Sequence, residues 1–166
     1  MTTSGIARRS PDAQMKAMSA DWPDFKGRKL PDGTLVWAGP LMPKARVYSV
    51  SILWNPGMMS LPYVMVNEPA LEPGPEGSFA AIPHLIFYAE KPERSGLCLF
   101  DPAGKEWSPA DLIAATTVKW ASEWLVYYEL WHLTGEWLAP GVGYESVARM
   151  HAGEAAAVKD ILADVH

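Results

Sequence analysis

Cysteine is nearly absent from this sequence, which has a single one, Cys98, among 166 residues. A lone thiol cannot form an internal disulfide, so a fold held together by disulfide bonds is excluded. The sequence also lacks an apolar run near the roughly 18 residues that a membrane span needs, and its first residues lack the apolar core of a signal peptide. We therefore predict a cytoplasmic protein with no membrane partner, whose thiol stays reduced.

Long runs of positive charge are missing as well. The chain has 14 lysines and arginines against 19 aspartates and glutamates, a formal net charge of −5, so we expect no nucleic-acid partner. The one short basic stretch, Lys26 to Lys29, is interpreted as a solvated turn. No metal site is predicted, because no zinc-ligand spacing connects the cysteine with the four histidines, His84, His132, His151 and His166.

Apolar and aromatic residues, in contrast, are plentiful. Hydrophobic residues make up 49% of the chain, which includes eight tryptophans, and a chain of this length can bury most of its apolar surface in one core. We predict a flexible N-terminus over residues 1–9 and a single domain over residues 10–166, with no internal repeat or boundary.

Short strands are predicted for the first half of the chain, after one short helix. Ser10 is a typical N-cap and Pro11 suits the first helical position, so a helix is expected from there to Ala20. Strands at close intervals, joined by turns, form an antiparallel meander. The strands are predicted over residues 34–38, where Gly39-Pro40 breaks the pattern, 46–54 and 61–66, with a fourth extended segment over 82–88.

Helices are predicted for the second half. Ser108 suits an N-cap, Pro109 the first turn and Asp111 a capping box, so helical structure is expected to begin there. One or two helices continue without proline or glycine as far as Gly135, and a final helix is predicted over residues 146–165. The predicted fold class is therefore α+β: a short helix, an antiparallel sheet, then helices.

An aromatic stripe lies on one face of the helical stretch. Its members are spaced three, four or seven residues apart, which places them on one side of a helix. Such a stripe is either a binding surface or the face that packs on the sheet, and we favour packing. The residues are Trp120, Trp124, Tyr127 or Tyr128, and Trp131.

Cys98 has two interpretations, a small core residue or a nucleophile. Its neighbours Leu97 and Phe100 are apolar, which favours burial, whereas the turn-rich residues 101–104 that follow favour access to solvent. His84 could supply a base for a Cys-His pair or could be a structural histidine. Residue chemistry alone leaves both questions open.

Five short motifs follow one another along the chain. They are WAGP at 37–40, WNPGMMSLPYV at 54–64, PH at 83–84, GLCLF at 96–100 and WSPADL at 107–112. Their order resembles that of the ubiquitin-conjugating (E2) enzymes, over about residues 10–133. In that family a strand ends near Gly-Pro, a proline-rich turn joins two later strands, His-Pro-Asn precedes Gly-x-Cys-Leu, and Trp-Ser-Pro opens the next helix.

The resemblance implies a ubiquitin-conjugating-enzyme (UBC)-like fold and an acyl transferase. Cys98 matches the cysteine nucleophile that carries the C-terminus of a ubiquitin-like protein as a thioester. His84 matches the histidine that holds the active-site loop, and Trp107-Ser108-Pro109 matches the opening of the following helix. Cys98 and His84 are thus the predicted catalytic residues, and no cofactor is expected.

Two departures from the eukaryotic E2 pattern concern the site. Pro83-His84-Leu85 replaces His-Pro-Asn, so the asparagine that supports the oxyanion is missing, and backbone N–H groups near Cys98 are expected to act instead. His84 also precedes Cys98 by 14 residues, a few more than in eukaryotic members, so the active-site loop differs. The candidates for the lip of the site are Tyr88, Glu90, Asp101 and Lys105.

These departures are similar to the prokaryotic E2-like proteins of CBASS antiphage systems, in the short type II form with a stand-alone E2. The resemblance implies that the conjugated partner is a cGAS/DncV-like nucleotidyltransferase or a ubiquitin-like modifier. The sequence offers no Gly-rich nucleotide loop and no room for an adenylating domain, so any E1-like protein would act in trans, and whether one is needed stays open.

Two other functions remain open from the sequence. A catalytically silent E2 variant would only bind a partner and would keep Cys98 as a relic. A Cys-His hydrolase of another fold would use Cys98 and His84 on a small ester or peptide.

Overall fold

The computed structural model describes residues 7–44, 46–74, 77–100 and 107–137. An N-terminal helix, α1 (Pro11–Asp21), precedes a six-stranded sheet, and a long helix, α2 (Thr117–Thr134), follows it. This order confirms the predicted α+β class. The predicted helix over residues 146–165 lies outside the described residues.

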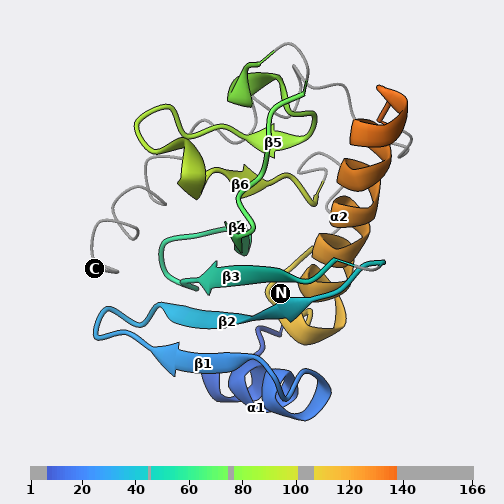
Figure 1. Ribbon diagram of the computed structural model, residues 1–166. Helices are drawn as coiled ribbons and strands as arrows, with labels where there is room; N and C mark the ends of the chain where they lie inside the picture. Colours follow the sequence, from blue (N-terminus) through green and yellow to red (C-terminus); the bar gives the residue numbers. More distant parts are fainter. Residues whose placement is uncertain (1–6, 45, 75–76, 101–106, 138–166) are drawn as a thin grey trace, which may run out of the picture.

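The sheet is antiparallel throughout, with the strand order β1-β2-β3-β4-β6-β5 (Figure 1). The first four strands form the predicted meander, and the last two exchange places, so that β6 pairs with both β4 and β5. The strands are β1 (Lys26–Lys29), β2 (Leu35–Leu41), β3 (Tyr48–Trp54), β4 (Tyr63–Glu68), β5 (Leu85–Ile86) and β6 (Gly96–Leu97).

Two predictions about the first strands are wrong. The basic stretch Lys26–Lys29 is an exposed edge strand rather than a turn, because its backbone pairs with β2 from Leu35 to Ala38. Strand β2 also continues through Gly39-Pro40 to Leu41. Proline is tolerated in a strand where one side lacks a partner, and β1 reaches only to Ala38. Gly39 is required because an added Cβ would lie 2.5 Å from the ring of Phe25.

The fourth extended segment, predicted over residues 82–88, is also much shorter than expected. A 3₁₀ helix, η1 (Phe79–Ala81), precedes it, and only Leu85–Ile86 form a strand. His84 interrupts the extended backbone with a φ of +51°, which lies outside the extended region that strand residues occupy.

Helix α1 begins and α2 ends as the sequence predicts. The Ser10 hydroxyl accepts a hydrogen bond from the Ala13 N–H at 3.1 Å, as an N-cap does. Gly135, with a φ of +80°, is the left-handed residue that closes α2.

The start of α2 was predicted about nine residues too early. The Ser108 N–H donates to the Asp111 carboxylate at 2.8 Å, as a capping box would, but these residues form an isolated turn. A 3₁₀ helix, η3 (Ile113–Ala115), follows before α2 begins at Thr117. The reason is tertiary, because the buried Gln14 side chain donates to the Asp111 carbonyl and accepts from the Ile113 N–H, both at 2.9 Å.

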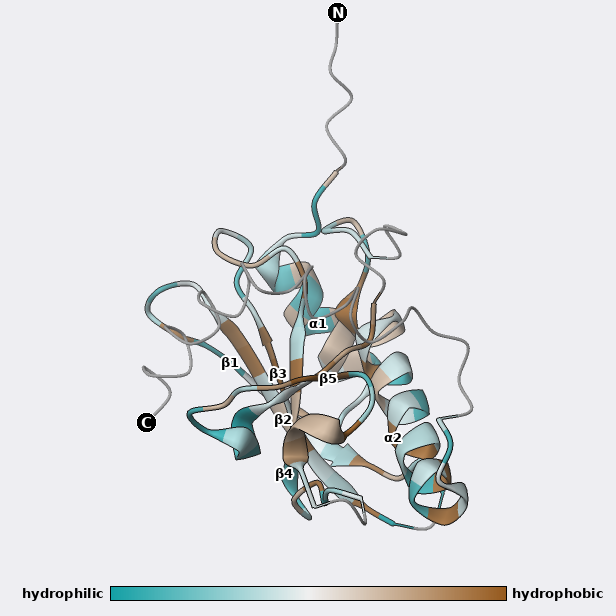
Figure 2. Cartoon of the chain, turned by 90° about the horizontal axis from the view of Figure 1, so that it is seen from above, coloured by the Kyte–Doolittle hydropathy of each residue, from teal (hydrophilic) through white to brown (hydrophobic). Residues whose placement is uncertain are grey.

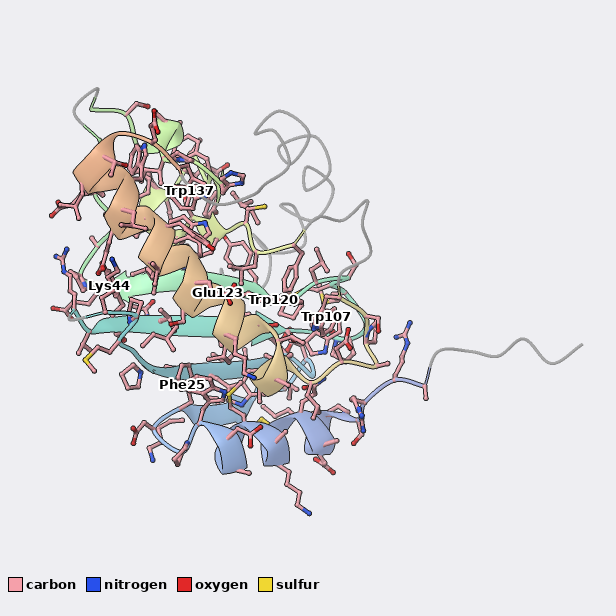
Figure 3. The ribbon with its side chains drawn as sticks, turned by 90° about the vertical axis from the view of Figure 1, so that its right-hand side faces the viewer. Phe25, Lys44, Trp107, Trp120, Glu123 and Trp137 are labelled. Carbon is pink, nitrogen blue, oxygen red and sulfur yellow. The ribbon has the colours of Figure 1, made fainter. Side chains whose placement is uncertain are left out.

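Helix α2 lies across one face of the sheet (Figure 3). Tyr48 of β3 points to this face and donates its hydroxyl to Glu129 of α2 at 2.8 Å. Trp124 and Tyr128 are buried beneath the helix, so the packing interpretation of the aromatic stripe is confirmed for them. Figure 2 shows apolar segments on the strands and polar segments on the loops and on turns of α1 and α2. None of the helices in the described ranges is long and apolar enough to cross a membrane.

Candidate functional site

Strands β5 and β6 bring the two predicted site residues together. Leu85 pairs with Leu97 and Ile86 with Gly96 in the antiparallel register, so His84 and Cys98 lie opposite each other just beyond the strand ends. The Cys98 N–H donates to the His84 carbonyl at 2.9 Å. Sheet pairing therefore joins two residues that are far apart in the sequence.

A tight contact with β4 holds β6 in place. The ring of Tyr63 lies where a Cβ on Gly96 would be, at 2.3 Å, so only glycine permits this approach. The Tyr63 hydroxyl donates to the Arg94 carbonyl at 2.6 Å, and burial raises the pKa of this hydroxyl. Tyr63 thus fixes the residues that lead to Cys98.

The loop between β5 and β6 contains two of the predicted lip residues. The Tyr88 N–H donates to the buried Ser95 hydroxyl at 2.9 Å, and the Tyr88 hydroxyl donates to the Glu90 carboxylate at 3.5 Å. These contacts place Tyr88 and Glu90 in the hairpin that leads into β6. The other two predicted lip residues, Asp101 and Lys105, lie outside the described residues.

The Cys98 side chain is mostly covered, with 8% of its surface exposed. Its thiol donates to the Phe100 carbonyl at 3.7 Å and is not in a disulfide. Burial of this kind suits a core cysteine, while the position at the end of a strand beside a histidine suits a nucleophile. An acyl partner would reach the sulfur only after the covering residues shift.

His84 contributes an unusual backbone conformation and a neutral ring. Its positive φ is uncommon for a non-glycine residue, although histidine is among the residues that adopt it more often. Burial lowers the pKa of the His84 imidazole, which favours the uncharged form at neutral pH. The ring lies 5.3 Å from the ring of Trp137, which follows α2.

The His84 carbonyl accepts a second hydrogen bond, from the indole N–H of Trp124 at 2.9 Å. Sequence reasoning assigned Trp124 to the core stripe and did not single out Trp137. The helical spacing of Trp124 indicates that it is buried, but no local signal shows which carbonyl its N–H meets.

An aromatic cluster includes Phe100, two residues after Cys98. The Phe100 ring is 5.0 Å from that of Trp120 and 6.4 Å from that of Trp107, and Trp107 packs edge-on against Trp54 at 4.9 Å. Trp107 and Trp120 are labelled in Figure 3. The Trp107 indole N–H donates to the Thr116 hydroxyl at 3.2 Å. Trp107 therefore anchors the chain after the site, but it does not open a helix as the resemblance implies.

The arrangement suits chemistry at a single thiol assisted by neighbouring polar groups. Within the described ranges, no three histidine, cysteine, aspartate or glutamate side chains are grouped as a metal ion would require. The Cys98 N–H is bonded to the His84 carbonyl, so it does not serve as an oxyanion donor in this geometry.

Comparison with known proteins identifies the family. No curated protein sequence matches the chain significantly. A family model described as "Type II CBASS E2 protein" matches residues 14–144, a span that includes His84, Cys98 and most of the described structure. Because this match covers well over half of the sequence, the chain belongs to the type II CBASS E2 protein family.

Proposed function

We propose that this chain fills its E2-like role in antiphage defence, which follows from its family, by carrying an acyl group on Cys98 as a thioester. The observation that supports this most is the position of Cys98. It follows β6 directly, inside the span that matches the family, and its N–H is bonded to the carbonyl of the predicted site histidine at 2.9 Å.

The proposed reaction is two successive acyl transfers. The Cys98 thiolate attacks the activated C-terminal carbonyl of a partner protein, held as a thioester on an E1-like enzyme, and the E1 thiol leaves with the proton that Cys98 gave up. An amine then attacks the Cys98 thioester, loses a proton and forms an amide, while the Cys98 thiolate is released.

His84 has two roles in this proposal. Its carbonyl orients the Cys98 backbone, and its neutral ring can accept the proton that the thiol or the attacking amine loses. The oxyanion needs a donor that is not the Cys98 N–H. The backbone N–H groups that follow Cys98 are the proposed source.

The proposed partner is the C-terminus of a cGAS/DncV-like nucleotidyltransferase or of a ubiquitin-like modifier, with an E1-like protein acting in trans. The family places the chain in a CBASS system. A thiol that must stay reduced also favours the cytoplasm.

A silent binding module is the second candidate, and the burial of Cys98 favours it. A side chain with 8% of its surface exposed needs a local opening before it can be acylated, whereas a relic cysteine needs none. The two candidates differ in what happens to the sulfur, so a direct test is available.

The test is co-expression of the full-length tagged protein with the genes that neighbour it, followed by intact-mass analysis without reductant. For the wild type we expect an adduct at the sum of the two protein masses less one water. Hydroxylamine at neutral pH cleaves a thioester but not a disulfide, so it identifies the bond. Cys98→Ala should give no adduct, and Cys98→Ser should accumulate an oxygen ester that resists thiol reductants.

Two results would contradict the proposal. If the wild type forms no adduct while a Cys98→Ala variant still binds its partner with unchanged affinity, the chain is a binding module. If the isolated protein turns over small esters, and either Cys98→Ala or His84→Asn abolishes this turnover, it is a hydrolase. Thermal unfolding of each variant controls for loss of the fold.

A further inference from the structure

We propose that Trp124 is a positioning residue for Cys98, acting through the His84 carbonyl. The inference concerns the geometry of the site, and its functional part rests on the proposed acyl transfer. Trp124 lies in the middle of α2, 40 residues from His84 in the sequence, and donates its indole N–H to that carbonyl at 2.9 Å.

The His84 carbonyl connects α2 to the end of β6, because it accepts hydrogen bonds from both. One of its lone pairs accepts from the Cys98 N–H and the other from Trp124, both at 2.9 Å. A carbonyl oxygen has two acceptor sites, so both are occupied. Movement of α2 at Trp124 therefore changes the position of the Cys98 backbone through one intervening atom.

The Trp124 hydrogen bond supports the backbone at the point where the regular ladder of β5 and β6 ends. Strand β5 begins at Leu85, and the left-handed φ of His84 takes its peptide out of the extended ladder. A backbone in a sparsely populated conformation persists only where its surroundings hold it. The Trp124 N–H supplies that support from outside the sheet.

The indole itself is held firmly. Trp124 has 4% of its surface exposed and stacks on Tyr128, with the ring centroids 5.5 Å apart and the planes 12° apart. On another side it contacts Trp137 at 5.1 Å, and Trp137 in turn contacts the His84 ring. Trp137, labelled beside α2 in Figure 3, thus contacts the rings of both residues that form the hydrogen bond.

Trp22 provides a matched control. Its indole N–H donates to the Ala114 carbonyl at 2.8 Å, so it makes the same kind of bond, between the end of α1 and η3. Trp22→Phe and Trp124→Phe each remove one indole N–H and keep an aromatic ring, and only the second bond involves His84.

The experiment measures two properties of Cys98 in the wild type, Trp124→Phe and Trp22→Phe. One is the rate of alkylation by iodoacetamide in the isolated protein across a range of pH, and the other is the initial rate of adduct formation in the co-expression system. Loss of one hydrogen bond of ordinary net strength corresponds to about a fivefold change. For Trp124→Phe we expect alkylation about fivefold faster, because the residues that bury the Cys98 thiol pack less tightly. Adduct formation should be about fivefold slower, because the thiol loses its orientation.

The comparison with Trp22→Phe, which loses the same kind of hydrogen bond elsewhere in the fold, distinguishes positioning from a general loss of stability. Equal effects of Trp124→Phe and Trp22→Phe, or no change in either rate for Trp124→Phe, would overturn the inference. If the wild type forms no adduct, the proposed function fails and the alkylation comparison alone decides the positioning role. Should Trp124→Phe not fold, benzothienylalanine at position 124, which replaces only the N–H by sulfur, takes its place.

Discussion

Strands β2 and β3 pair along seven residues each, whereas β5 and β6, next to His84 and Cys98, pair along two. In the first region the backbone ladder and a buried face made by Tyr48, Val50 and Ile52 hold the structure. In the second, side chains bond to backbone groups, as Tyr63 does to Arg94 and Trp124 to His84.

This difference separates a region that stabilises the fold from a region that allows an irregular backbone. A regular ladder gives stability but leaves every polar backbone group paired and every side chain in a fixed alternation. Short strands joined by side-chain bonds allow an irregular backbone, such as the left-handed His84, to stand beside a thiol. Regions of this kind open more readily than core strands, and the proposed acylation of the covered Cys98 thiol requires such an opening.

The first prediction concerns a core substitution in the regular region, and its cost should exceed those of the predictions that follow. Ile52 is fully buried in β3, so Ile52→Ala should lower the free energy of unfolding by roughly 2–5 kcal/mol, because it removes apolar contacts and leaves a cavity. Urea denaturation measures the loss. Ser49→Ala, at a half-buried position on the opposite face of the strand, is the control and should change stability by less than about 0.5 kcal/mol. A cost for Ile52→Ala as small as that of the control would contradict the packing described here.

The second prediction concerns a substitution that destabilises the irregular region, at a smaller cost in unfolding free energy. Gly96→Ala places a methyl group against the Tyr63 ring and should cost roughly 1–3 kcal/mol, because β6 must move away from β4. Amide hydrogen exchange should show lost protection at Cys98 before it shows any at β3.

Gly57→Ala serves as the control for this variant. The nearest atom to an added Cβ at Gly57 is the Asn55 Oδ1 at 3.5 Å, an ordinary contact. This substitution should leave stability unchanged or slightly higher. Equal losses at both glycines would mean that the contact between Tyr63 and Gly96 does not hold β6.

The third prediction concerns how the stability of the region around His84 depends on pH. Burial lowers the pKa of His84 in the folded protein, while an unfolded histidine titrates at about pH 6.5. The unfolded state therefore binds more protons below that pH, and the stabilising contribution of neutral His84 is present above it and decreases as the pH falls. His84→Asn tolerates the left-handed backbone and removes this titration.

The measurement is the difference in unfolding free energy between the wild type and His84→Asn, from pH 8 to about pH 5. Groups that titrate equally in both proteins cancel, so the wild type should lose its relative advantage only below about pH 6.5. A difference that is constant with pH would show that the His84 ring is as well solvated in the folded protein as in the unfolded one.

Local patterns in the sequence predicted much of the fold. Ser10 and Pro11 placed the start of α1, Gly135 placed the end of α2, and runs of β-branched, aromatic and other apolar residues located β3 and β4 within two residues at each end. The order of five motifs indicated the family that the comparison then showed. These features depend on backbone preference and on which side of an element is apolar, and short stretches of sequence carry both.

The hydrogen bond from Trp124 to the His84 carbonyl and the late start of α2 depend on tertiary structure. The Trp124 N–H could have met any buried acceptor, and only the crossing of α2 over the sheet brings it to the His84 carbonyl. Ser108 and Asp111 have the residues of a helix start, yet Gln14, 97 residues before Asp111, occupies the backbone groups that a helix would need. The sequence by itself determines which groups must be satisfied locally, whereas the partner of a buried polar group depends on how the whole chain packs.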